Sequence, residues 1–140
     1  MAASPILALQ GIKLTLGSTL LLDGAELSVL PGDKIALVGR NGSGKSTLLK
    51  IAAGEIEADG GKRFLQPGVT IRYLPQEQDL RGYATTLAYA EAGLEHGNDP
   101  YRAQYLLEHL GLTGAEDPAR LSGGEARRAA LARVLAPEPD

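Results

Sequence analysis

Apolar residues in the first half of the chain occur in short runs separated by glycine-containing breaks. This pattern predicts β-strands, because strands are short and glycine marks turns. The expected strands are 6–9, 12–16, 20–22 and 25–30, with breaks at Gly11, Gly17-Ser18 and Asp23-Gly24. Such short connections join antiparallel neighbours, so the chain is expected to open with an antiparallel β region.

A further apolar segment, residues 34–38, reads as a buried strand that leads into a glycine-rich loop. The loop is followed by a helix over 46–53, and Gly54 stands where a C-cap glycine belongs. After a polar surface loop, residues 62–65 and 69–74 are predicted as two more strands.

From Thr85 onward the pattern predicts helices. The first is capped by Thr85 or Thr86 and runs to about Leu94, and the second opens at Asp99-Pro100 and ends at Gly111. Its expected buried stripe consists of three apolar residues, Tyr105, Leu106 and Leu110. After a loop over 113–120, the last helix covers 122–136 and is ended by Pro137.

The composition narrows the class of protein. The 140 residues carry a formal net charge of −3, which argues against a general nucleic-acid binder. There are no cysteines, which excludes disulfides and thiolate metal sites. No apolar run has the length of a membrane span, and the first residues lack the pattern of a secretory signal. A cytoplasmic protein without direct membrane insertion is therefore expected.

The glycine-rich loop has the pattern G-x-x-x-x-G-K-S of a phosphate-binding loop: Gly39, Arg40, Asn41, Gly42, Ser43, Gly44, Lys45 and Ser46, followed by Thr47. Its glycines let backbone N–H groups approach and surround a polyphosphate at a helix N-terminus. Lys45 supplies a positive charge toward the phosphates, and the Ser46 hydroxyl is a ligand for Mg²⁺. The alternative is a glycine-rich turn that matches by chance, but the expected strand and helix on either side favour a nucleotide site.

Two other motifs carry chemistry. Gln76 follows the predicted strand 69–74, and its side chain can bind Mg²⁺ or hold a water. Taken alone, however, the residue is more simply a polar residue where a strand meets solvent. Leu121-Ser122-Gly123-Gly124-Glu125 contains a Ser-x-x-Glu capping box. Two glycines in a first helical turn cost stability, which makes sense if an anion approaches the bare backbone there.

Together, the loop at 39–47, Gln76 and the motif at 121–125 resemble the ATP-binding-cassette (ABC) ATPases, in which they correspond to Walker A, the Q-loop glutamine and the signature motif. The resemblance implies an α/β fold of the P-loop NTPase class. It divides the chain into an antiparallel β part (1–33), a P-loop core (34–78), a helical part (79–121) and a signature helix (122–136). The motifs Leu-Ser-Gly-Gly-Glu and Tyr-Leu-Pro-Gln-Glu lean toward the ABC-F subfamily.

The same resemblance implies a mechanism. Two ABC domains, in a homodimer or in tandem, sandwich two ATP molecules. Residues 39–47 hold the phosphates from one side, and Ser122, Gly123 and Gly124 of the opposing domain cover the γ-phosphate. Ser46 and Gln76 are the expected Mg²⁺ contacts, with Gln76 also the catalytic residue assigned in this chain. Through a longer parent protein the domain would work with a ribosome or with a membrane permease, and the sequence leaves that choice open.

The chain departs from the family in two places. The stretch 14–17 lacks the aromatic residue that stacks on adenine, so Leu16 is the available base contact. The Walker B aspartate, catalytic glutamate and switch histidine are not among the 140 residues. A truncated domain with an incomplete core sheet is therefore expected, with weak or no hydrolysis by these residues alone. A non-hydrolysing binding module and a fragment that does not fold alone remain alternatives.

Other candidates receive structural interpretations. His96 and His109 are expected at the surface or in packing, and residues 55–59 as a solvated acidic loop rather than a metal site. Arg127 and Arg128 are read as a solvated or capping face, against a role at an interface or on RNA. Four of the five tyrosines are expected to pack rather than to stack on bases: Tyr83, Tyr89, Tyr101 and Tyr105.

Overall fold

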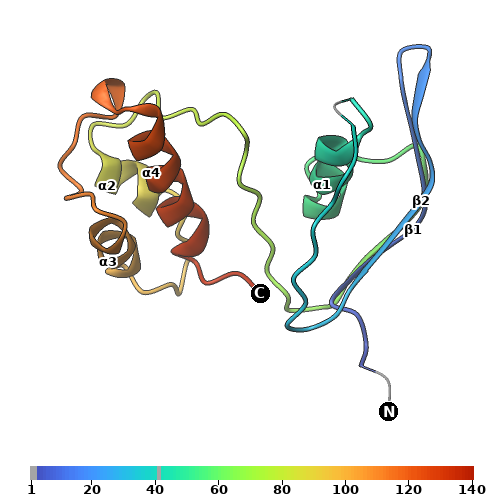
Figure 1. Ribbon diagram of the computed structural model, residues 1–140. Coiled ribbons are helices and arrows are strands. Elements are labelled where there is room, and N and C mark those ends of the chain that lie inside the picture. Colours follow the sequence, from blue (N-terminus) through green and yellow to red (C-terminus); the bar gives the residue numbers. More distant parts are fainter. Residues whose placement is uncertain (1–2, 41) are drawn as a thin grey trace. The chain divides into compact units, whose positions relative to one another are not determined.

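The computed structural model describes residues 3–40 and 42–140 (Figure 1). The chain forms two compact units, Met1–Ile71 and Arg72–Asp140, which we call the N-terminal unit and the C-terminal unit. The first holds the strands and one helix, and the second holds the remaining helices.

The N-terminal unit contains a three-stranded antiparallel sheet in the order β2-β1-β3. The strands are β1 (Leu7–Leu16), β2 (Thr19–Val29) and β3 (Gly60–Leu65). A tight turn at Gly17-Ser18 joins β1 to β2, with Gly17 in the left-handed region at φ 63°. The predicted antiparallel pairing and the predicted strand near 62–65 are thus confirmed.

The prediction of four short strands before residue 31 is wrong, because Gly11 and Gly24 interrupt no strand. The register of the β1–β2 pair shifts between Leu9 and Ile12 and again between Ile12 and Lys13. Gly11 and Gly24 lie at these shifts with φ of 60° and 74°. A β-bulge takes one extra residue in a conformation that glycine adopts without strain, so pairing continues on both sides.

Helix α1 (Lys45–Ala53) packs against the sheet, as Figure 1 shows for the helix beside β1 and β2. The apolar core between them is centred on Leu9, Ile12 and Ile51, each almost fully buried. The predicted C-cap is confirmed, since Gly54 is left-handed at φ 84° and its N–H donates to the carbonyl of Ile51.

The strands predicted over 34–38 and 69–74 do not form, because neither segment has strand structure. Ile35 is 49% exposed and Val38 is 93% exposed. A strand needs neighbouring backbone to accept and donate its hydrogen bonds. The described sheet consists of β1, β2 and β3 alone, so residues 34–38 keep the apolar pattern of a buried strand without a partner.

The C-terminal unit is helical. Its elements are α2 (Thr86–Glu91), α3 (Arg102–His109), the short 3₁₀-helix η1 (Pro118–Arg120) and α4 (Gly123–Leu135). The three α-helices contact one another, and small buried alanines on α2, α3 and α4 let them approach closely. The Thr85 side chain caps α2 by accepting from the N–H of Ala88, as predicted.

Three details of the helical prediction are wrong. Helix α2 ends at Glu91 rather than near Leu94, and residues 118–120 of the expected loop form η1. Helix α3 is buried at Ala103 and Leu107, and the predicted Leu106 and Leu110 are partly buried against the same core. The predicted Tyr105 is instead 49% exposed.

Two of the four tyrosines pack as predicted. Tyr89 is buried and meets Tyr83 edge to face, with ring centroids 5.4 Å apart. The guanidinium of Arg133 lies over the Tyr89 ring at 4.8 Å from its centroid and donates to the Tyr83 hydroxyl at 3.1 Å. Tyr101 and Tyr105 are exposed, so the packing prediction is wrong for them.

Candidate nucleotide-binding site

The glycine-rich loop leads directly into the N-terminus of α1. Gly42 and Gly44 are left-handed, at φ 80° and 94°, and Gly44 is the N-cap residue of the helix. Among the described residues, no side chain caps this end of α1. The N–H of Ser43 donates to the carbonyl of Arg40 at 3.1 Å, which closes the loop on itself. The first-turn N–H groups of α1 are therefore left for an external acceptor.

Two of the loop glycines have close neighbours. A Cβ built on Gly39 would lie 2.9 Å from the hydroxyl oxygen of Ser43. A Cβ on Gly44 would lie 3.1 Å from Leu22 and 3.2 Å from Leu21 of β2. The start of α1 therefore packs against strand β2.

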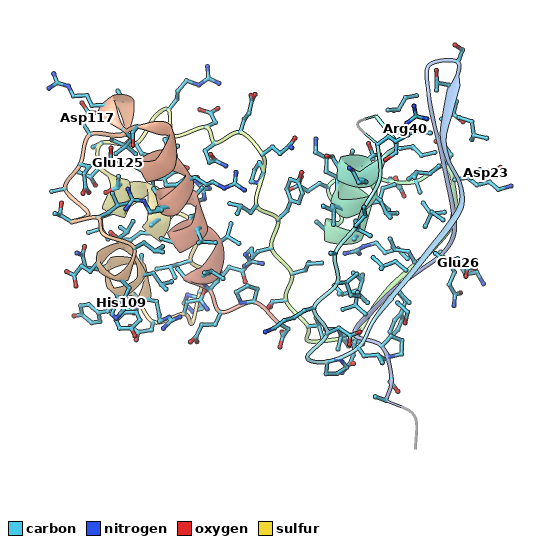
Figure 2. The ribbon with its side chains drawn as sticks, viewed as in Figure 1. Asp23, Glu26, Arg40, His109, Asp117 and Glu125 are labelled. Atoms are coloured by element: carbon cyan, nitrogen blue, oxygen red, sulfur yellow. The ribbon has the colours of Figure 1, made fainter. Side chains whose placement is uncertain are left out.

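The charged and hydroxyl groups of the loop surround the same helix end. The ammonium of Lys45 donates to the carbonyl of Gly39, so its side chain folds back across the loop. Ser46 is exposed and Thr47 half-buried, and Arg40 lies at the N-terminal end of α1 (Figure 2). Asn41 lies outside the described residues.

A magnesium ion with its phosphates fits this donor set. Mg²⁺ prefers oxygen ligands and is commonly held by one or two protein groups together with substrate phosphates. The exposed hydroxyl of Ser46 in the first turn of α1 is such a group. Among the described residues, no cluster of three or more His, Cys, Asp or Glu side chains could hold a metal without phosphate.

The N-terminus of α4 has a complete capping box. The hydroxyl of Ser122 accepts from the N–H of Glu125 at 3.2 Å, and the Glu125 carboxylate accepts from the N–H of Ser122 at 3.1 Å. The bonds with the Ser122 backbone and side chain lower the pKa of Glu125. Figure 2 shows Glu125 at the end of α4 that follows η1.

The glycines of this turn have no local structural reason to be glycine. Ser122, Gly123 and Gly124 are all exposed. A Cβ added to Gly123 or Gly124 would meet nothing within 4 Å, and neither residue has a positive φ. In contrast to Gly39 and Gly44, these positions would accept alanine without a clash. The bare backbone faces open space, as an external ligand requires.

Gln76 lies in the irregular segment that opens the C-terminal unit and is exposed. Its backbone carbonyl accepts from the Gln78 side chain at 3.3 Å. The strand expected before it is absent. Gln76 and the turn 122–125 belong to the C-terminal unit, whereas residues 39–47 belong to the N-terminal unit.

Sequence reasoning missed a carboxylate that organises the loop before η1. Glu116 accepts hydrogen bonds from the Thr86 hydroxyl at 2.8 Å and from the N–H groups of Thr113 and Gly114 at 2.7 and 2.8 Å. Desolvation raises its pKa, but the hydrogen bonds from Thr113, Thr86 and Gly114 outweigh that effect and lower the pKa to about 2. No local motif marks this contact, because Thr86 is thirty residues away.

Two arginines close helix ends in the same way. Arg63 of β3 donates from Nε and Nη2 to the carbonyl of Ala52 at 3.0 and 2.9 Å, at the C-terminus of α1. Arg128 of α4 donates from Nη1 to the carbonyl of Leu110 at 2.9 Å, just after α3. The capping interpretation of Arg128 is therefore confirmed.

The profile of the family described as ABC transporter matches residues 22–140. The chain belongs to the ABC transporter family. The P-loop, the capped Gly-Gly turn and the β-then-helix order agree with this assignment, and the resemblance drawn from the motifs is confirmed.

Curated relatives include both kinds of ATP-binding protein that the motifs left open. The chain is 49% identical over 140 residues to the ATP-binding protein Uup of Caulobacter vibrioides, covering 99% of this chain and 22% of that protein. It is 40% identical over 134 residues to the aliphatic sulfonates import ATP-binding protein SsuB of Frankia casuarinae, covering 94% and 44%. The chain therefore spans less than half the length of these two relatives.

Solved structures confirm the ABC ATPase fold. The ATP-binding cassette MJ1267 of an ABC transporter aligns with a TM-score of 0.77 at 25% identity, covering 98% of this chain and 67% of that one. The dimeric cassette MJ0796 aligns with a TM-score of 0.83 at 25% identity, covering 95% and 70%. In the part of the chain that the structure describes, no helix is long and apolar enough to span a bilayer.

Proposed function

We propose that the chain binds Mg²⁺-ATP through residues 39–47, as one half of an ABC-type ATP site. The observation that carries this proposal is the start of α1. Its N-cap is a left-handed glycine that offers no side chain to cap the helix, and Lys45 is folded across the loop beside it. Backbone dipoles and an ammonium group then act on one point in space, which suits a triphosphate.

The second part of the proposal concerns the exposed turn 122–124. The capping box holds the turn in helical geometry, and the two glycines leave its outer surface free of side chains. A phosphate presented by another domain can reach this backbone. The proposed partner is therefore a second ABC domain, in a homodimer or on the same longer chain.

For the metal, Ser46 supplies the hydroxyl ligand and Gln76 supplies an amide oxygen. The bound Mg²⁺ neutralises charge on the phosphate oxygens. Ser46 stands in the first turn of α1, and Gln76 is exposed and lies in an irregular segment, where its side chain is free to turn. Gln76 is proposed to link metal occupancy to the C-terminal unit.

Hydrolysis is proposed for the complete assembly and not for these residues alone. Phosphoryl transfer to water needs groups that orient the attacking water and complete the metal shell. The Walker B aspartate and the catalytic glutamate that the family resemblance implies for this task are not among the 140 residues. The 140 residues by themselves are therefore expected to bind nucleotide and to release little phosphate.

Between the translation-linked and transport roles we propose the ABC-F assignment. The support is the pair of motifs at 73–77 and 121–125, together with an identity of 49% to Uup against 40% to the sulfonate import subunit. A ribosome would then be the larger partner, and a membrane permease is the alternative.

A titration with a fluorescent ATP analogue and Mg²⁺ tests the proposal. We expect saturable binding, and Lys45→Ala should weaken it at least about tenfold, because a charge-assisted contact to phosphate is lost. Lys50→Ala is the matched control: it removes the same charge from the last turn of the same helix and should change affinity less than about twofold. Absence of saturable binding, or equal effects of the two substitutions, would overturn the proposal.

A further inference from the structure

We propose that Arg128 is a positioning residue that fixes the exposed turn Ser122–Gly124 relative to the carboxyl end of α3. Its consequence for nucleotide binding rests on the proposed function, in which this turn faces the nucleotide of a second domain. The positioning itself is a property of the C-terminal unit and can be measured without nucleotide.

Arg128 joins two backbone carbonyls from different elements. Its Nη1 donates to the carbonyl of Leu110 at 2.9 Å, at the end of α3. Its Nε donates to the carbonyl of Gly124 at 3.3 Å, in the first turn of α4. A single rigid guanidinium therefore spans the gap between the end of one helix and the glycine turn of the other.

The guanidinium of Arg128 passes over Gly111, which has no side chain. A Cβ built on Gly111 would lie 3.0 Å from Nη1 of Arg128, and Gly111 is left-handed at φ 85°. Glycine at this position thus serves the end of α3 and also leaves room for the arginine. Alanine at position 111 would press directly on the bridging group.

The electrostatics of the two helices explain why the bridge is an arginine. A cation in the second turn of α4 is disfavoured by the positive end of that helix's own dipole. The same cation is favoured at the carboxyl end of α3, where the carbonyl groups carry partial negative charge. The hydrogen bond to the Leu110 carbonyl offsets this unfavourable interaction with the dipole of α4. The positive charge of Arg128 therefore draws the start of α4 toward the end of α3.

The neighbouring Arg127 provides the contrast. It has the same charge and sits one position earlier on α4, where it is exposed. No hydrogen bond or ion pair of the Arg127 side chain is found within residues 3–40 and 42–140. If charge near the glycine turn were the only requirement, the two arginines would be equivalent.

Amide hydrogen exchange in the 140-residue chain tests the positioning directly. The N–H of Glu125 donates to the Ser122 hydroxyl, and the N–H of Ala126 donates to the Ser122 carbonyl at 2.9 Å. In Arg128→Ala we expect both amides to exchange about tenfold faster, because a charged hydrogen-bond donor that restrains this turn is removed. Arg128→Lys should behave similarly, since an ammonium group lacks the planar fork that spans two carbonyls.

Two internal controls separate positioning from general stability. Arg127→Ala should leave the exchange of Glu125 and Ala126 unchanged. The N–H of Tyr89, which donates to the Thr85 carbonyl on α2, should keep its rate in every variant. Unchanged rates at Glu125 and Ala126 in Arg128→Ala would overturn the inference. So would equal acceleration at Tyr89, which would indicate loss of overall stability only.

Mixed pairs of copies test the consequence for nucleotide. A Lys45→Ala copy offers its glycine turn but no phosphate site, and an unmodified copy binds the ATP analogue. Placing Arg128→Ala in the Lys45→Ala copy should weaken ATP-dependent association about tenfold, whereas placing it in the nucleotide-binding copy should not. Equal association in both arrangements would overturn the role of Arg128. Absence of ATP-dependent association between unmodified copies would instead contradict the proposed pairing, and the exchange rates would still decide the positioning.

Discussion

The carboxylate of Glu116 accepts a hydrogen bond of 2.8 Å from the hydroxyl of Thr86, a side chain with no exposed surface. The backbone repeats the connection, because the N–H of Thr86 donates to the Glu116 carbonyl at 3.0 Å. The loop before η1 is thereby fastened to the first residue of α2. A buried hydroxyl needs such a partner, since leaving it unpaired costs about 1–3 kcal/mol.

This contact predicts an acid-sensitive C-terminal unit. The folded pKa of Glu116 is about 2, below its unfolded value of 4.5, so its contribution to stability is complete above pH 4.5. As the pH falls from 4.5 toward 2, the unfolded state takes up the proton first, and the contribution is progressively lost. Thermal unfolding measured from pH 6 to pH 2 should show this decline.

The comparison with Glu116→Gln isolates the effect. Asp79, whose pKa is also lowered to about 2 by its bonds with Arg81, titrates in the same window in both proteins. The difference in melting temperature between Glu116→Gln and the unmodified chain should therefore shrink as the pH falls to 2. A difference that is constant with pH would contradict the assignment.

Substitution of Gly123 or Gly124 by alanine should separate folding from function. Both positions have room for a Cβ and an ordinary φ, and alanine is favoured over glycine in a helix by about 1 kcal/mol. We expect an unchanged or higher melting temperature together with weaker ATP-dependent association. Association of unmodified strength would show that bare backbone at this turn is not needed.

Gly93→Ala should lower the stability of the C-terminal unit. A Cβ on Gly93 would lie 2.5 Å from the backbone oxygen of Arg133, where the end of α2 meets α4. Rigid backbone cannot move aside cheaply, so we expect destabilisation by about 1–3 kcal/mol in denaturant unfolding. Gly123→Ala serves as the control glycine substitution, and a neutral Gly93→Ala would mean that the two helices pack less tightly than described.

Removal of the Arg63 side chain should loosen the C-terminus of α1. Arg63 donates two hydrogen bonds to the Ala52 carbonyl, and a charged donor of this kind contributes about 1.5–3 kcal/mol when well paired. Arg63→Ala should lower the free energy of unfolding by an amount near the lower end of that range. The adjacent Lys62→Ala removes the same charge from an exposed position and should change stability by less than about 0.5 kcal/mol.

Leu16→Tyr should strengthen ATP binding. Leu16 is 55% exposed at the end of β1 and occupies the stretch where related ATPases carry an adenine-stacking aromatic. An aromatic contact adds about 0.5–1.5 kcal/mol beyond the area it buries, which corresponds to a gain of about twofold to tenfold. Affinity for inorganic triphosphate, which has no base, should stay the same. If the affinity for both ATP and inorganic triphosphate rose, the substitution would act on phosphate binding and not on the base.

Much of the site follows from local sequence because its determinants are local. The glycine pattern sets the left-handed residues at 42 and 44, and Ser122 with Glu125 forms a capping box over three residues. Gly54 and Thr85 act on their own helix ends. Each of these features depends on backbone conformation within a few residues. They can therefore be predicted from the sequence alone.

The wrong predictions share a different cause. Gly11 and Gly24 look like turns until the opposing strand shows that they are bulges. Residues 34–38 look like a buried strand, yet Val38 is 93% exposed because no strand lies beside it. No sequence motif marks the long-range hydrogen bonds of Glu116, Arg63 and Arg128. Hydrogen-bond partners far away in sequence decide these features.

The amino-acid sequence alone therefore determined the family, the succession of an antiparallel β region and a helical region, and the two glycine-containing helix ends. Backbone torsions and caps specify these over short distances. Tertiary structure alone decided which apolar segments are covered, which face of α3 is buried, and which arginine holds the start of α4. Burial and long-range hydrogen bonds depend on which elements become neighbours in space, and that information appears only when the chain has folded.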